Sequence, residues 1–274
     1  MIHAFLKWQK KVYPFTQKES ELLELCNRSS LDDETLERFY QLAADKEVDI
    51  NCKSSSNFTP LQHLFLRNSI SLLCCLQSLI RRKNLDLNIK NAQGFNVLHA
   101  VCFSYSGDHL LEIVLLLLQY GIHLNAISRN GYNALLCLCC RPKQMAYVPK
   151  FFDTFQALIN AGIDVKSRPG MLDPLIALTT NHLTHLGYFL MARLLIESGC
   201  CVNGKDDRGR TALIIISADY YGSKLYELVR LLVERGADAS VRDNDGLNAV
   251  NYLEQRHFLG FLGISKLFTV LIGI

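Results

Sequence analysis

Residues 96–133 read NVLHAVCFSYSGDHLLEIVLLLLQYGIHLNAISRNGYN, and this stretch contains the pattern that repeats along the chain. It begins with Asn96, a residue type whose side chain accepts a backbone hydrogen bond in the first turn of a helix. Gly121 follows a long apolar run and can adopt the left-handed conformation that closes a helix. Asparagine returns at Asn133, 37 residues after Asn96. The stretch therefore predicts two helices, a turn and the start of another such unit.

Capping residues recur at nearly constant spacing over most of the sequence. An aliphatic residue follows each of them two positions later, and another follows three positions after that, so that one face of the helix is apolar. Successive capping residues lie 37 residues apart, except for steps of 40 and 38 on either side of Asp173. Such a period indicates an array of stacked units that bury their apolar sides against their neighbours. The predicted helix starts are Thr59, Asn96, Asn133, Asp173, Thr211 and Asn248.

A residue that tolerates a positive φ stands shortly before each predicted helix start. Glycine fills this position in five units, and asparagine, which adopts positive φ more readily than most residues, fills it in the first. Tight turns are therefore expected between the units. The predicted turn residues are Asn57, Gly94, Gly131, Gly170, Gly209 and Gly246.

These motifs resemble the ankyrin repeat. The family pattern has a capped first helix, a second helix ending in Leu-Leu-x-x-Gly-Ala-Asp, and a hairpin. Thr59-Pro60-Leu61, Thr211-Ala212-Leu213 and residues 231–238 match parts of that pattern. The resemblance covers residues 47–274. It implies an all-α fold, an ankyrin-type α-solenoid of stacked helix-turn-helix repeats joined by β-hairpin-like loops.

Residues 1–46 are predicted to form a helical pair that caps the N-terminal end of the array, and residues 47–274 to form the ankyrin repeat domain. Thr16 and Glu19 form a capping-box pattern ahead of an apolar run. A second helix is expected to start at Ser30, because acidic residues follow it where the helix dipole favours negative charge. The charged face of this pair is what a terminal unit requires.

Composition argues against several classes of function. Hydrophobic residues make up 49% and charged residues 20% of the 274 residues, as in ordinary folded proteins. A formal net charge of +3 gives no indication of nucleic-acid binding. The N-terminus has no apolar stretch of secretory-signal length, so the ten cysteines are expected to be reduced thiols. The sequence predicts a cytoplasmic protein, with a nuclear location as the alternative.

Residues that suggest chemistry favour a structural interpretation. Cys137, Cys139 and Cys140 lie on one predicted helix and lack the second ligand pair of a zinc site. His182 and His185 have ligand-like spacing, but no acid or thiol is near them in the sequence. Phosphate-binding loops and nucleophile motifs are absent. We expect no enzyme activity, cofactor or metal, and a metal or catalytic site on the cysteine cluster is the alternative.

Residues 257–274 differ from the units before them. When the sequence is shifted by 37 residues, charged positions of residues 225–236 become apolar in residues 262–273. The shift predicts an exposed apolar face, which has three possible explanations: further repeats, self-association or partner docking, and membrane contact. Membrane contact is disfavoured, because the segment is short for a span.

The resemblance implies that a partner protein binds in a groove between hairpin tips and first helices. Aromatic and arginine side chains are enriched at binding hot spots. Phe58, Phe95 and Tyr132 are predicted to form a ladder that grips an apolar or extended segment; alternatively, each ring packs on the adjacent hairpin for structural reasons. The predicted partner-binding residues are Phe58, Phe95, Tyr132, Arg129, Asn130, Asp207, Arg208, Arg210, Asp245 and Leu247.

The predicted function is a non-catalytic scaffold for protein–protein interaction. One alternative is a substrate-recognition adaptor of a ubiquitin ligase, although the family members of that kind carry a recruiting box after the array. Another is a membrane-associated scaffold that uses the apolar C-terminal helix. Nucleic acid is not expected among the partners.

Overall fold

The computed structural model describes residues 15–67, 72–141, 150–166, 172–182, 187–256, 267 and 269–271. The chain divides into two compact units, residues 1–129 and residues 130–274, which are described separately. Within the described residues there is no β-strand, and Lys205 and Thr211 form one isolated antiparallel bridge. The all-α prediction is confirmed. The predicted boundary at residue 46 stays a prediction.

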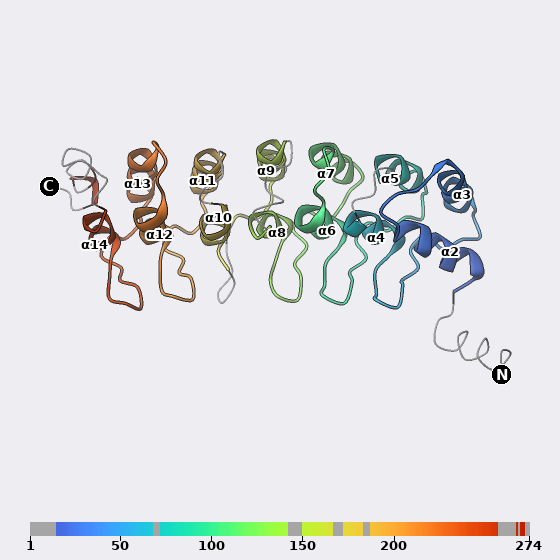
Figure 1. Ribbon diagram of the computed structural model, residues 1–274, viewed down its shortest axis with the longest axis horizontal. Helices are drawn as coiled ribbons and strands as arrows, with labels where there is room; N and C mark the ends of the chain where they lie inside the picture. The colour runs from blue at the N-terminus through green and yellow to red at the C-terminus, as the bar shows by residue number, and fades with distance from the viewer. Residues whose placement is uncertain are drawn as a thin grey trace. The chain divides into compact units, whose positions relative to one another are not determined.

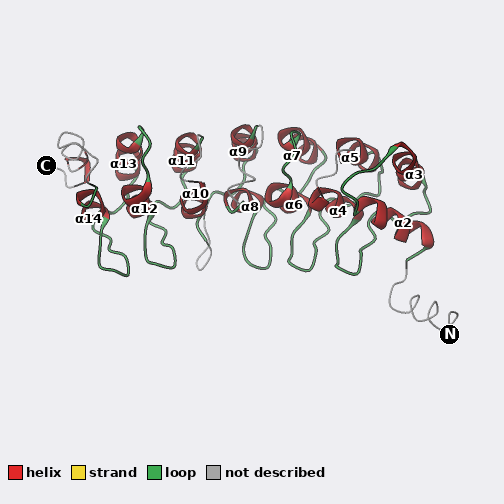
Figure 2. Cartoon of the chain, viewed as in Figure 1, coloured by secondary structure: helices red, strands yellow, loops and turns green. Residues whose placement is uncertain are grey.

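The first unit consists of helix pairs arranged in two layers (Figure 1). Helices α2, α4 and α6 pack in chain order in one layer, and α3 packs against α5 in the other. The turns between repeats extend away from the first helices as long loops (Figure 2). The bounds are α2 Gln17–Cys26, α3 Asp33–Ala44, α4 Pro60–Arg67, α5 Leu72–Ile80, α6 Val97–Ser104 and α7 Leu110–Gln119.

The second unit has the same organisation. Helices α8, α10, α12 and α14 pack in chain order, and α9, α11 and α13 form the second layer. The core between the layers is aliphatic, with Leu213, Ile216 and Leu228 among its buried side chains. The bounds are α8 Ala134–Cys139, α9 Phe151–Asn160, α10 Pro174–His182, α11 Tyr188–Glu197, α12 Ala212–Asp219, α13 Leu225–Glu234 and α14 Ala249–Glu254.

All six predicted helix starts are confirmed as capping residues. The side chain of Asn96, for example, accepts a hydrogen bond from the backbone N–H of His99. Equivalent bonds from backbone N–H groups are accepted by the side chains of the other five caps, which are Thr59, Asn133, Asp173, Thr211 and Asn248. The stacked repeats thus begin where local stereochemistry favours a helix start.

The N-terminal helix pair follows the prediction with one correction. Thr16 and Glu19 form the predicted capping box of α2. The second helix does not start at Ser30. Its N-cap is Asp32, whose carboxylate accepts the backbone N–H of Thr35 at 2.9 Å. Both residue types can cap a helix, and the one in hydrogen-bonding reach of the first turn determines the boundary.

The turn residues adopt the predicted left-handed backbone. Asn57 has φ +66°, and the described glycines of the equivalent turns also have positive φ. At Gly94 the requirement is also steric, because a Cβ atom there would lie 2.9 Å from the backbone nitrogen of Arg129 in the next turn. Gly170 lies outside the described residues.

Long polar side chains join successive repeats within each unit. In the first unit, Lys53 Nζ donates to the carbonyl of Lys90, and Lys90 Nζ donates to the carbonyl of Ile127, both at 2.9 Å. Three arginines reach back to carbonyls near the end of a helix in the preceding repeat. Arg82 binds Ala43 and Asp45, Arg235 binds Ile196, and Arg256 binds Ser217 and Tyr220.

The cysteine cluster predicted to be part of the core is mostly buried. Cys137 and Cys139 are inside α8, and Cys140 is half-buried. Among the described residues, no group of three or more His, Cys, Asp and Glu side chains could hold a metal ion. His185 lies outside those residues.

Little of the predicted apolar C-terminal face can be compared with the structure. Of residues 257–274, the described part comprises residue 267 and residues 269–271. None of the helices in the described part of the chain combines the length and apolar character that a bilayer span requires.

Candidate functional site

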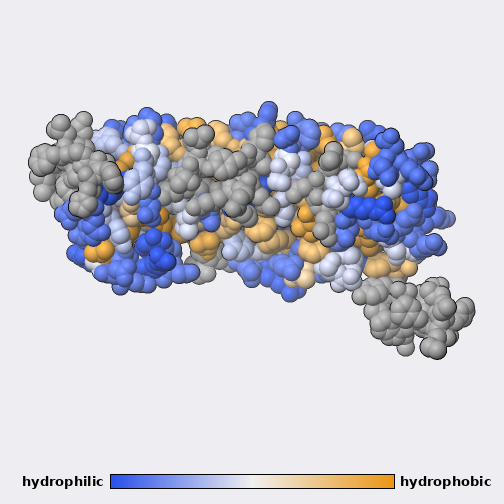
Figure 3. Space-filling view, in the orientation of Figure 1, coloured by the Kyte–Doolittle hydropathy of each residue, from blue (hydrophilic) through white to orange (hydrophobic). Residues whose placement is uncertain are grey.

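A pocket of 760 Å³ lies between helix α10 and the following hairpin in the second unit. We call it the α10 pocket. Three of the predicted partner-binding residues line it, namely Asp207, Arg208 and Arg210. The hairpin surface around them is mostly hydrophilic (Figure 3). The complete lining is Leu172, Ile176, Ala177, Thr180, Asn181, Lys205, Asp206, Asp207, Arg208 and Arg210.

Helix α10 forms one wall of the pocket. Asp173 fixes its start, because the carboxylate accepts the backbone N–H of Leu175 at 2.8 Å. Ile176 and Ala177 line the pocket and are almost completely buried. Thr180 is exposed one turn further along the helix. The α10 wall therefore combines buried aliphatic side chains with an exposed hydroxyl group.

The hairpin of residues 205–210 forms the opposite wall, and Asp206 shapes its turn. The Asp206 carboxylate accepts the backbone N–H groups of Arg208 at 3.0 Å and Arg210 at 2.8 Å. The backbone N–H of Asp206 donates to the carbonyl of Arg210 at 3.0 Å, which closes the turn. Gly209 has φ +74°, a backbone conformation that residues with a Cβ atom rarely adopt.

The next hairpin, residues 242–247, holds this turn in place through hydrogen bonds from Asn244. The backbone N–H of Asn244 donates to the carbonyl of Arg208 at 2.9 Å. The Asn244 side-chain amide donates to the carbonyl of Asp207 at 3.2 Å. Both carbonyls at the tip are thus hydrogen-bonded, and the tip has a defined position at the pocket.

The charges of the pocket are only partly compensated. Arg210 Nη2 and Nε lie 2.8 and 2.9 Å from Asp206 Oδ2, and both side chains are largely buried. Arg208 and Lys205 are exposed, and neither forms an ion pair within the part of the chain that the structure describes. Asp207 is exposed at the same tip. Two cations and one carboxylate therefore face solvent at the rim.

The other predicted residues of the second unit lie outside this pocket. Asp245 is exposed at the tip of the next hairpin, and Leu247 is half-buried beside the start of α14. Asn130 is exposed and Tyr132 is half-buried. The burial of Tyr132 raises the pKa of its phenol. None of these four residues contributes to the α10 pocket.

In the first unit, the two predicted phenylalanines pack against histidines of their own repeats. The ring of Phe95 stacks on His99, with centroids 5.2 Å apart and planes 7° apart. The ring of Phe58 meets His63 edge-on at 5.6 Å. These contacts give both half-buried rings a structural role. Their part in a binding ladder stays a prediction, as does that of Arg129, whose backbone N–H donates to Gln93.

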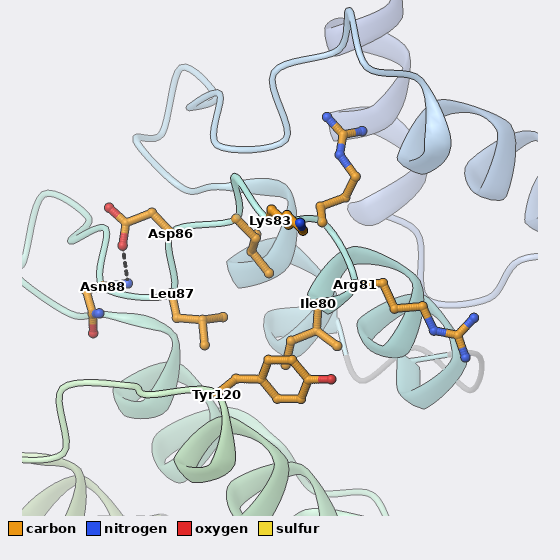
Figure 4. Close-up of a pocket in the computed structure, with 9 residues that line it drawn as sticks. Ile80, Arg81, Lys83, Asp86, Leu87, Asn88 and Tyr120 are labelled. Carbon is orange, nitrogen blue, oxygen red and sulfur yellow. Dashed lines mark hydrogen bonds between the residues drawn. The ribbon is translucent and has the colours of Figure 1, made fainter.

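A second pocket, of 520 Å³, lies in the first unit at the end of α5 and is lined in part by the basic run at residues 81–83 (Figure 4). A run of adjacent like charges is usually a solvated helix end. Arg81 and Lys83 are indeed exposed, whereas Arg82 is engaged with backbone carbonyls. The ring of Tyr120 lies near Ile80 and Leu87 at the edge of this pocket. The sequence did not predict this pocket, because Tyr120 and the basic run belong to different repeats.

Residues 208–244 match the ankyrin repeat family. The matched segment extends from the tip of the hairpin at the α10 pocket through α12 and α13 to Asn244 in the next hairpin. The match identifies residues 208–244 as an ankyrin repeat, and the two layers of capped helix pairs give the other described repeats the same ankyrin-type fold.

Among solved structures, the chain is similar to the ankyrin repeat domain of Bcl-3, described as a unique member of the IkappaB protein family. The identity is 20%, the TM-score is 0.56, and the alignment covers 92% of this chain and 98% of that chain. In all, 448 chains of solved structures match, so the likeness defines the fold and selects no partner. No curated protein sequence matches the chain.

Proposed function

We propose that this protein is a non-catalytic scaffold that binds a partner protein through the α10 pocket. The observation that carries the proposal is a hairpin tip fixed by Asn244, with Arg208 unpaired beside a pocket on the first helix of the preceding repeat. The resemblance to ankyrin repeats implies that partners bind to hairpin tips and to the first helices of the repeats. The pocket lies between those two kinds of element.

The pocket is suited to an extended protein segment. Its volume of 760 Å³ is in the range of sites that accommodate a few side chains. Thr180 is exposed in its wall, and its hydroxyl makes no hydrogen bond to the described residues. That group is available to the backbone of a bound segment. Leu172 is half-buried and offers limited apolar contact.

The test blocks the pocket with a neutral bulky side chain. The Thr180→Trp variant fills the pocket from an exposed position, so we expect the fold to be retained. The matched control is Leu190→Trp on α11, where the native side chain is 47% exposed and does not line the pocket. Wild-type protein and both variants are immobilised and used to capture partners, which are identified by mass spectrometry and then purified.

A purified partner should bind wild-type protein and the Leu190→Trp variant with similar affinity and should lose binding to Thr180→Trp. Circular dichroism and urea denaturation establish that both variants are folded. Equal binding to the two variants would show that the partner uses another surface, and loss of binding to Leu190→Trp alone would assign the interaction to α11.

A further inference from the structure

We infer that the α10 pocket selects an acidic segment of its partner, with a carboxylate placed against Arg208 and Lys205. This inference rests on the proposed function, because it names the chemistry of the segment that the pocket binds.

Ion pairing among the charged residues that line the α10 pocket leaves an excess of positive charge in the lining. Five charged residues line the pocket, and two of them, Asp206 and Arg210, are paired with each other. Both Asp206 oxygens are occupied, one by backbone N–H groups and the other by the Arg210 guanidinium. This carboxylate therefore has little capacity to compensate Arg208. Two exposed cations remain in the lining, with Asp207 as its other exposed charge. Outside the lining, the Asp238 carboxylate lies within electrostatic reach of Lys205, so Arg208 is the less compensated of the two cations.

The backbone position of Arg208 is fixed before any partner arrives. Asn244 binds the carbonyls of both tip residues, and Asp206 binds the backbone N–H of Arg208. A backbone held in this way loses little conformational entropy on binding. The planar guanidinium of arginine can also donate two parallel hydrogen bonds to one carboxylate, which favours an acidic side chain over a neutral one.

The neighbouring hairpin has the opposite charge at the equivalent position. Asp245 stands 37 residues after Arg208 and is also exposed. Leu247 likewise replaces Arg210. An acidic group is therefore attracted to the tip at Arg208 and repelled by the tip at Asp245. The preference for a carboxylate belongs to the α10 pocket and is not a property of every hairpin in the second unit.

The experiment selects peptides from a phage-displayed library of random sequences on immobilised wild-type protein. Enriched peptides are synthesised with a fluorescent label, and their affinities are measured by anisotropy. We expect enrichment of Asp and Glu over the unselected library. Arg208→Glu should weaken binding about tenfold, whereas Asp207→Asn should strengthen it about twofold. Raising the salt concentration should weaken binding, because the charges are exposed.

The matched control is Arg230→Glu on α13. It makes the same change of charge at an exposed position, where the native arginine pairs with Glu234 outside the pocket. Affinity for the peptides should be unchanged in this variant. An equal loss in Arg230→Glu and Arg208→Glu would indicate a general effect of net charge and would overturn the inference.

The Thr180→Trp variant separates failure of this inference from failure of the proposed function. Peptides that require an open pocket but carry no excess of acidic residues, or that bind Arg208→Glu normally, would overturn the inference and leave the proposed function standing. A selection in which no peptide is sensitive to Thr180→Trp would contradict both.

Discussion

The side-chain amide of Asn244 donates a hydrogen bond to the backbone carbonyl of Asp207, which lies 37 residues earlier in the chain (3.2 Å). This distance in sequence equals one repeat. The contact therefore joins equivalent turns of successive repeats and holds the rim of the α10 pocket in place.

Substitution of Gly209 should be more costly than substitution of Gly236. Both glycines have positive φ, so alanine is strained at either position by about 1 kcal/mol. A Cβ atom on Gly209 would also lie 2.7 Å from Asn244 Oδ1, whereas a Cβ atom on Gly236 meets no atom within 4 Å. Urea denaturation should show a larger loss of unfolding free energy for Gly209→Ala. Equal losses would mean that the Asn244 side chain moves away from the added Cβ atom without any loss of unfolding free energy.

Arg82 should stabilise the first unit, whereas its neighbour Arg81 should not. Arg82 Nη1 donates to the carbonyls of Ala43 and Asp45 at 2.8 and 2.7 Å. Its removal leaves part-buried carbonyls without these bonds, so Arg82→Ala should cost about 2 kcal/mol. Arg81 is exposed, and Arg81→Ala should change stability by less than about 0.5 kcal/mol. Hydrogen exchange at the end of α3 should increase in the first variant alone; similar effects of both would contradict the assignment.

The members of two adjacent cysteine pairs, Cys74/Cys75 and Cys200/Cys201, should react unequally with thiol reagents. Cys74 and Cys201 are exposed, whereas Cys75 and Cys200 are buried. Burial raises the pKa of the Cys75 thiol to about 12 and also raises the pKa of Cys200, so little thiolate forms at either buried position. Iodoacetamide labelling of native protein at pH 8, followed by peptide mass spectrometry, should modify the exposed member of each pair first. Denatured protein should lose this selectivity, and equal native labelling would show that the buried thiols are accessible.

Tyr252 should contribute stability that disappears at high pH. Its hydroxyl donates to Asp243 Oδ2 at 2.7 Å, and this bond to a carboxylate raises the pKa of Tyr252 from 10.0 to about 12. A raised pKa in the folded state means that the contribution is complete below pH 10 and is lost as the pH rises towards 12. Tyr252→Phe should therefore be less stable than wild type by about 1 kcal/mol at neutral pH, and the difference should shrink above pH 10.

The control for this pH dependence is Tyr226→Phe, because Tyr226 is 37% exposed on α13. Its difference from wild type should remain small at every pH. A constant difference between wild type and Tyr252→Phe across the alkaline range would show that the bond to Asp243 does not survive in solution.

Most of the architecture could be predicted because it depends on local stereochemistry. A capping side chain bonds a backbone N–H two or three residues away, and positive φ is a property of a single residue. Asn57 illustrates this: it was predicted to replace glycine in the first turn, and its φ is +66°. Ser30 and Asp32 show the limit of such reasoning, because two good capping residues lie within one turn and the sequence alone does not rank them.

The candidate site was predicted only in part. From the repeat pattern alone, Asp207 and Arg208 could be assigned to a hairpin tip and Arg210 to the position between the turn glycine and the helix cap. The pocket beside them depends on which side chains of α10 face that tip and on the support from Asn244 in the next repeat. The pairing of Phe95 with His99 is close in sequence, yet its stacked geometry depends on packing that residue types do not specify.

The arginines that reach back one repeat impose an order on the completion of the chain. Arg235 bonds the carbonyl of Ile196, and Arg256 bonds those of Ser217 and Tyr220. Because synthesis proceeds from the N-terminus, each of these helix ends emerges from the ribosome before the side chain that satisfies it. A nascent chain that pauses within a repeat therefore leaves these carbonyls of the preceding repeat without their arginine partners. The completely hydrogen-bonded part of the fold ends about one repeat before the most recently synthesised residue.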